Sequence, residues 1–103
     1  MWQVRYTKEA QSEILELDNS LRMQILKGIQ KVCENPLPQS EGGYGKSLGN
    51  MRGNNLAGYF KIKYNKINIR VVYTLDRTGK VMHIIVVSKR SDGACYYVAT
   101  KRI

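Results

Sequence analysis

The residues of this sequence best suited to chemistry are basic, and they follow a regular spacing in its second half. Lys61 and Lys63 are one residue apart, and alternate residues of a β-strand point to the same face of a sheet. Arg70 stands inside a second apolar run, and Arg90 follows a third. If these runs are neighbouring strands, one face of the sheet gathers two lysines and two arginines. Such a face is suited to hold a polyanion.

Three apolar, β-branched runs position these cations, over residues 59–64, 67–75 and 81–88. Two turn signals separate the runs, Asn65-Lys66 and the segment 76–79, of sequence Asp-Arg-Thr-Gly. This pattern is typical of an antiparallel β-meander. Alternation in the second run places Arg70 on the face opposite to its apolar residues, which are Ile67, Ile69, Val71, Tyr73 and Leu75.

The first half of the chain predicts the elements that cover this sheet. Residues 2–6 alternate between apolar and polar side chains, as a strand does. Apolar residues at helical spacing predict two helices, spanning roughly residues 8–17 and 20–34 with ends uncertain by about 2–4 residues. Thr7 is suited to cap the first helix, and the segment Asp18-Asn19-Ser20 offers caps for the second. Gly28 is expected to let the two helices approach each other closely.

The remaining segments carry less pattern. Residues 39–58 are rich in glycine and lack periodicity, which predicts a loop, and residues 94–103 predict a short helix or a tail. The expected fold class is therefore α+β. An antiparallel sheet, made of the N-terminal strand and the three-stranded meander, packs against a two-helix hairpin. Residues 1–103 are expected to form a single domain, since a chain of this length builds one modest core.

Composition narrows the cellular setting. The sequence has no apolar run long enough to span a membrane, and its first residues are too polar for a secretory signal. Cys33 and Cys95 are far apart and have no metal-ligand spacing, so free thiols in a reducing cytoplasm are expected. We expect neither a metal nor another cofactor, and no membrane partner.

The charge is distributed unevenly along the chain. Residues 1–50 contain six Lys and Arg and six Asp and Glu, whereas residues 51–103 contain eleven Lys and Arg and only two acidic residues. The net charge of +9 thus belongs to the second half. A field this lopsided favours a phosphate backbone as partner. Membrane surfaces are bound mostly by basic amphipathic helices, and the basic half here reads as strands.

The order of short motifs in residues 48–103 closely resembles that of the RelE toxins of bacterial toxin–antitoxin pairs. The motifs are Met51-Arg52-Gly53, Tyr59-Phe60-Lys61-Ile62-Lys63, Ile69-Arg70-Val71-Val72-Tyr73, Ser88-Lys89-Arg90, Tyr96, and Ala99-Thr100-Lys101-Arg102-Ile103. RelE-like toxins have a lysine pair one residue apart, an arginine before two apolar residues and a tyrosine, a late arginine, and a tyrosine six residues further on. Those positions are occupied here by Lys61, Lys63, Arg70, Arg90 and Tyr96.

This resemblance implies a ribosome-dependent mRNA endoribonuclease that cleaves mRNA in the ribosomal A site and is held inactive by a cognate antitoxin. Cleavage without metal uses the ribose 2′-hydroxyl as nucleophile, with a proton acceptor, a proton donor and cations around the phosphate. By resemblance, Tyr96 is the base and Arg90 the donor or leaving-group stabiliser, while the remaining three positions hold the phosphate. Further RNA contacts are expected from Lys46, Arg52, Lys66 and Lys89.

Other interpretations remain open. Lysines at alternate strand positions often form only a solvated face, and Tyr96 could simply pack the tail. The alternation of the third run places His83 on the face opposite to Arg90, which favours a structural histidine. A ParE-like toxin would share the fold but bind DNA gyrase, typically without the cationic set. A non-catalytic RNA-binding module would need exposed aromatic side chains, for which only Tyr59 lies on the lysine face of its strand.

Overall fold

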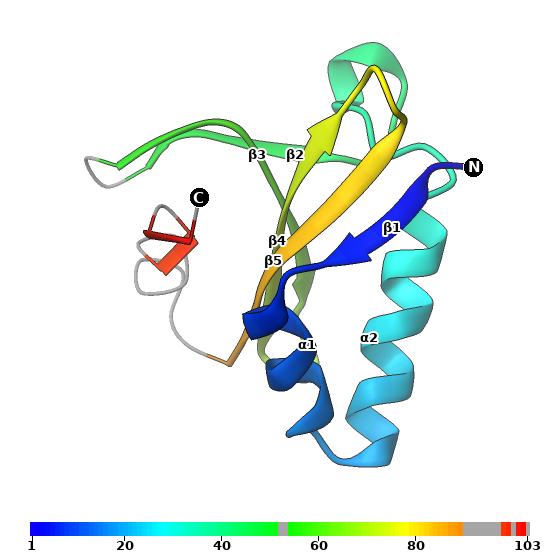
Figure 1. Ribbon diagram of the computed structural model, residues 1–103, viewed down its shortest axis with the longest axis vertical. Coiled ribbons are helices and arrows are strands. Elements are labelled where there is room, and N and C mark those ends of the chain that lie inside the picture. Colours follow the sequence, from blue (N-terminus) through cyan, green and yellow to red (C-terminus); the bar gives the residue numbers. More distant parts are fainter. Residues whose placement is uncertain (52–53, 90–97, 100, 103) are drawn as a thin grey trace.

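The computed structural model describes residues 1–51, 54–89, 98–99 and 101–102. The elements are β1 (Gln3–Tyr6), α1 (Lys8–Leu15), α2 (Asn19–Val32), a short 3-10 helix (Gln39–Glu41), β2 (Lys46–Met51), β3 (Asn54–Tyr64), β4 (Ile69–Asp76) and β5 (Val81–Ser88). The strands form one sheet in the order β1-β5-β4-β3-β2, and α1 and α2 pack against it (Figure 1). The α+β fold with its meander and helix pair is as predicted.

The sheet differs from the prediction in one pairing. The pairs β2–β3, β3–β4 and β4–β5 are antiparallel, but β1 runs parallel to β5, so the sheet is mixed. Tight turns join the meander strands and fix their antiparallel direction. Both helices and three strands separate β1 from β5 in the sequence. No local signal therefore sets the direction in which these two strands pair.

The first helix begins at the predicted cap Thr7, and the second begins at Asp18, one of the three residues expected to offer its cap. The side chain of Thr7 accepts a hydrogen bond from the Ala10 amide at 3.1 Å, and that of Asp18 accepts one from the Leu21 amide at 2.9 Å. These bonds satisfy amides that have no partner inside the helix. Arg22 closes the other end of α1 by donating to the Leu15 and Leu17 carbonyls, both at 3.0 Å. Contacts within the helix pair therefore fix both helix starts and the end of α1.

The helices cover one face of the sheet, which we call the helix face. Tyr73 is fully buried there, stacks on Phe60 with ring centroids 5.2 Å apart, and donates to the Pro36 carbonyl at 3.1 Å. The buried cluster on this face comprises Ala10, Ile14, Ile25, Ile29, Cys33, Phe60, Ile69, Val71, Tyr73, Met82, Ile84 and Val87. The alternation predicted for residues 67–75 is thereby confirmed.

Gly28 serves a different contact from the predicted one. A Cβ atom at this position would collide with the ring and hydroxyl of Tyr64 on β3. The Tyr64 hydroxyl donates to the Ile25 carbonyl at 2.8 Å, one turn earlier in α2. The glycine thus allows α2 to approach the sheet, where the sequence suggested a helix–helix approach.

Another prediction that fails concerns residues 39–58, which were expected to be a loop. Residues 46–51 form β2, and residues 54–58 belong to the long strand β3. The resulting β2–β3 hairpin extends well beyond the rest of the sheet (Figure 1). β2 is an edge strand with an irregular register between Ser47 and Gly49, so its pairing with β3 does not depend on an apolar alternation that could be read from the sequence.

A β-bulge in β5 changes the expected orientation of its side chains. Val72 pairs with Val86 and Tyr73 pairs with Ile84, so Ile85 has no partner on β4. Strict alternation fails at this residue, because two residues of β5 stand against a single step of β4. Met82 and Ile84 therefore lie on the helix face.

The opposite face of the sheet, which we call the cation face, carries Lys61, Lys63 and Arg70. A smaller buried cluster lies on this face and comprises Leu48, Val72, Ile85, Val86 and Ala99, with Tyr59 and Val98 packed against it. Val98, Ala99 and Lys101 are helical. The end of the chain therefore contributes to a core on the side of the sheet away from α1 and α2 (Figure 1).

Candidate nucleic-acid interface

Two neighbouring rows of paired residues cross the cation face. In the first, Lys63 on β3 stands directly opposite Arg70 on β4, and Arg70 stands opposite Ser88 on β5. Paired residues of adjacent strands point to the same side of a sheet, with Cβ atoms about 4.5–5.5 Å apart. Lys63 is exposed, whereas Arg70 and Ser88 are half-buried. The common face that strand alternation predicts for Lys61, Lys63 and Arg70 is thus confirmed by the register.

The second row adds a cation from the β2 edge. Lys46 stands opposite Lys61, which in turn pairs with Val72, and Val72 pairs with Val86. Lys46 is exposed and Lys61 half-buried. The row is thus cationic at the edge of the sheet and apolar toward its centre. Lys46 was assigned to RNA contacts from the sequence, and the pairing with Lys61 was not foreseen because β2 itself was not.

Both rows bring like charges together. Like charges directly opposite each other on neighbouring strands destabilise a sheet. Lys46–Lys61 and Lys63–Arg70 are two such pairs on the same face. A bound phosphate would turn this repulsion into attraction. The arrangement is therefore suited to an anionic ligand.

The other expected RNA contacts are dispersed. Lys89 is exposed and follows the last residue of β5 directly. Lys66 is exposed in the β3–β4 turn, where it lines a shallow pocket of about 190 Å³ with Gln24 of α2 and with Tyr64. The structure thus places Lys66 beside the helices and apart from the two rows. Arg52, Arg90 and Tyr96 lie outside the described residues.

His83 is positioned differently from the prediction. It pairs with Thr74, which shares the cation face with Arg70, because the bulge at Ile85 reverses the alternation beyond it. His83 is nevertheless four residues along the sheet from the Arg70 row, roughly 13 Å at the rise of a β-strand. The buried row of Val72 and Val86 lies between them. A structural role for His83 is still favoured, because His83 is far from the Arg70 row although it lies on the same face of the sheet.

Buried tyrosines on the helix face are unsuited to act as bases. Burial raises the pKa of Tyr64 and of Tyr73 well above the ordinary value of 10.0. Burial, and secondarily Cys33, also raises the pKa of Tyr6. Tyr59, on the cation face, packs against the apolar cluster around Val72 and is not freely exposed for base stacking.

Within residues 1–51, 54–89, 98–99 and 101–102, no group of three His, Cys, Asp or Glu side chains is placed to hold a metal ion. Over the same residues, no helix has both the length and the apolar character needed to cross a bilayer. Cys33 is a free, buried thiol whose pKa is raised by burial and by Glu34.

Comparison with known proteins places this chain in a family. Residues 4–93 match the family described as the ParE toxin of the type II toxin–antitoxin system parDE. The chain belongs to this toxin family. It is also similar to a putative RelE-like toxin protein of Escherichia coli, with 26% identity over 103 residues that span 99% of this chain and 97% of the relative. The expected RelE-like toxin of the RelE/ParE superfamily is thereby confirmed.

Solved structures of RelE toxins share this fold. The isolated Escherichia coli RelE toxin is 26% identical with a TM-score of 0.68, and the match covers 99% of this chain and 98% of that one. A double mutant of the same toxin in the free state is 25% identical with a TM-score of 0.75, covering 99% and 97%. The toxin fold is also shared by a chain of the intact Escherichia coli RelBE toxin–antitoxin complex, at 23% identity and a TM-score of 0.69, over 88% and 99%.

Proposed function

We propose that this toxin is a metal-independent endoribonuclease that cleaves mRNA in the ribosomal A site and so inhibits translation. The observation that carries the proposal is the pair of cationic rows, Lys63–Arg70 and Lys46–Lys61, on one face of the sheet. Lysine and arginine side chains at these positions fit an RNA phosphate. Residues 1–103 are taken as one domain, because both apolar clusters pack on a single sheet.

The proposed reaction needs only side chains of the protein. The phenolate of Tyr96 accepts the proton of a ribose 2′-hydroxyl, and the resulting alkoxide attacks the adjacent phosphorus. The bond from phosphorus to the 5′-oxygen breaks, which leaves a 2′,3′-cyclic phosphate, and Arg90 donates a proton to the leaving oxygen or stabilises its charge. Lys61, Lys63 and Arg70 stabilise the negative charge of the pentacoordinate transition state. No metal or other cofactor takes part.

Partners follow from the same proposal. The substrate is mRNA held by the ribosome, so the toxin acts in the cytoplasm, and Lys46, Arg52, Lys66 and Lys89 would add contacts to RNA. A cognate antitoxin would bind and silence the toxin, as complexes of RelE relatives with the antitoxin RelB suggest.

The decisive experiment incubates the purified toxin with ribosomes programmed with a defined mRNA and maps the cleavage sites. We expect cleavage in the A-site codon, and a strong reduction when both Lys61 and Lys63 are replaced by alanine. Lys27→Ala is a matched control, because Lys27 is an exposed cation of α2 and lies outside the cationic rows. Intact mRNA with the wild-type protein, or equal loss with Lys27→Ala, would reject the proposal.

The family match itself favours a second candidate, inhibition of DNA gyrase. The matching model describes ParE toxins, and this activity was the alternative that the sequence left open. A gyrase supercoiling assay separates the two functions. Inhibition of supercoiling together with intact mRNA on ribosomes would establish the second candidate in place of the first.

A further inference from the structure

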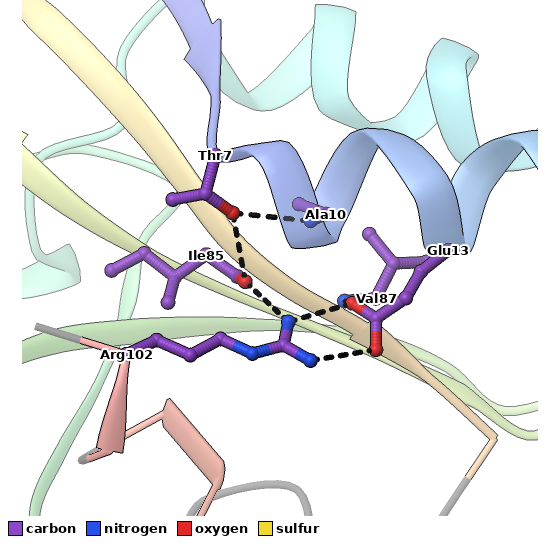
Figure 2. A network of polar contacts seen from close by, with 6 residues as sticks. All are labelled: Thr7, Ala10, Glu13, Ile85, Val87 and Arg102. Carbon is purple, nitrogen blue, oxygen red and sulfur yellow. Dashed lines mark hydrogen bonds and ion pairs between the residues drawn. The ribbon is translucent and has the colours of Figure 1, made fainter.

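Arg102 connects the end of the chain to the first helix. Its Nη1 donates to Oε1 of Glu13 and to the carbonyl of Ile85, both at 2.8 Å, and its Nη2 donates to Oε2 of Glu13 at 3.1 Å. Figure 2 shows this fork between the guanidinium and the carboxylate. The side chains of Arg102 and Glu13 are only 17% and 25% exposed. The contact therefore joins α1, β5 and the C-terminal segment, by which we mean residues 98–99 and 101–102, at one partly buried point.

The network satisfies polar groups that the sheet leaves open. The pairing of β1 with β5 ends at Tyr6 and Ile84, and the bulge leaves Ile85 without a partner on β4. The Ile85 carbonyl accepts from Arg102 and from the hydroxyl of Thr7, the latter at 3.3 Å, while the Val87 amide donates to Glu13 at 3.0 Å (Figure 2). Buried backbone groups without partners are costly, so these side chains complete the edge of β5.

The same segment also packs on the cation face. Ala99 is fully buried against Val72, Ile85 and Val86, and Val98 packs against this cluster. Val72 stands in the same row as Lys61 and follows Arg70 by two residues on β4. The residues held by Arg102 thus lie directly beside the proposed phosphate-binding rows.

We propose that Arg102 and Glu13 are positioning residues, which hold the C-terminal segment on the cation face next to Lys61 and Arg70. Tyr96, which the family resemblance assigns as the base, is only two residues before Val98 in the sequence. The anchoring part of this proposal stands on the contacts alone. The consequence for catalysis rests on the proposed function, since neither residue touches the reacting atoms.

A second arginine–glutamate pair gives a matched control. Arg77 donates to both carboxylate oxygens of Glu41, at 2.8 and 2.9 Å, with nearly the same geometry. The side chains of Arg77 and Glu41 are 54% and 44% exposed. This pair joins the 3-10 helix to the β4–β5 turn, away from the C-terminal segment. Arg77→Ala removes the same charge and the same fork without loosening the end of the chain.

Amide hydrogen exchange tests the anchor without any assay of activity. In Arg102→Ala we expect exchange at Ala99 and Val87 to become about tenfold to a hundredfold faster, as loss of hydrogen bonds to a charged partner predicts. Glu13→Gln preserves the volume of the side chain and should produce the same change to a smaller degree. Glu13→Gln also provides the test of the anchor if Arg102→Ala does not fold. Arg77→Ala should leave both amides at the wild-type rate. Equal rates in Arg102→Ala, Arg77→Ala and the wild type would overturn the anchor.

Kinetics on programmed ribosomes test the positioning role. If Arg102 positions the segment, Arg102→Ala should lower kcat about tenfold or more and leave KM nearly unchanged, because the cationic rows stay intact. Arg102→Lys, which retains the charge but not the fork, should recover part of kcat. A change in KM alone, or no change in either constant, would reject positioning. If the wild type does not cleave mRNA, the proposed function and with it the positioning role fail, while the exchange experiment still decides the anchor.

Discussion

The two faces of this sheet show how one element serves both folding and recognition. On the helix face, two capped helices cover a continuous apolar cluster that includes Tyr73, Ile84 and Ile25. On the cation face, a smaller apolar cluster adjoins two rows of cations, Lys46–Lys61 and Lys63–Arg70. Apolar burial stabilises the first face, whereas like charges oppose stability on the second.

Polar groups are also treated differently on the two faces. The hydroxyls of Tyr64 and Tyr73 on the helix face each donate to a backbone carbonyl, at 2.8 and 3.1 Å. Such bonds fix side chains in the core and keep them neutral. On the cation face, Lys63 and Lys46 extend into solvent, where a ligand can reach them. Changes on the helix face should therefore alter stability, and changes on the cation face should alter activity.

The largest effect is expected for the residues assigned to proton transfer. Arg90→Ala or Tyr96→Ala should lower ribosome-dependent cleavage by about 10²–10⁴-fold, the usual contribution of a positioned acid or base, with the fold intact. His83→Ala should retain the activity, because His83 lies beside Thr74, beyond the buried row of Val72. Cleavage assays and circular dichroism on all three variants check this. An inactive His83→Ala beside an active Arg90→Ala would point to a histidine-based nuclease.

The helix face should respond to alkaline pH. Because burial raises the pKa of Tyr64 and Tyr73 above 10.0, both stay neutral in the folded protein where tyrosines of the unfolded chain ionise. The stability that these two neutral tyrosines add to the folded protein is complete below about pH 10. It is lost as the pH rises from there toward the folded-state pKa. Urea unfolding at several pH values measures the slope. The double variant Tyr64→Phe with Tyr73→Phe should unfold with a shallower pH dependence, and an unchanged slope would contradict the buried-tyrosine explanation.

Close packing on the helix face should reverse an ordinary helix preference. Alanine normally stabilises a helix relative to glycine by about 1 kcal/mol, but a Cβ at Gly28 would meet the ring of Tyr64. We expect Gly28→Ala to destabilise the protein by about 1–3 kcal/mol, as overpacking does. Lys27→Ala, at the exposed neighbouring position of α2, should be neutral or slightly stabilising. Urea denaturation of both variants decides the matter, and a more stable Gly28→Ala would disprove the close approach.

The smallest effect, and the clearest contrast between the faces, concerns Lys61. Lys61→Gln removes one of two directly opposed lysines, so we expect the free protein to gain roughly 0.2–1 kcal/mol. The same change should weaken RNA binding and reduce its dependence on salt, because one phosphate contact is lost. Lys27→Gln on α2 should do neither. A destabilised Lys61→Gln with unchanged RNA binding would show that the lysine belongs to the fold instead of the site.

The sequence by itself determined the periodic parts of this protein. The meander, the helix pair, the caps at Thr7 and Asp18 and the shared face of Lys61, Lys63 and Arg70 follow from spacing and turn chemistry, which act between residues close in the chain. The family could also be named from the order of motifs, and the comparisons agree. The roles of Arg90 and Tyr96 remain predictions.

Only the tertiary structure decided the contacts between distant segments. Which strand edges meet in space decides three features, namely the parallel pairing of β1, the strand β2 opposite β3 and the bulge at Ile85. The bulge alone made the predicted face of His83 wrong. The fork between Glu13 and Arg102 joins residues at opposite ends of the chain. No local pattern encodes such a pair, because a glutamate and an arginine this far apart in the sequence would each be expected on an exposed surface. Only the folded edge of β5 places them next to each other.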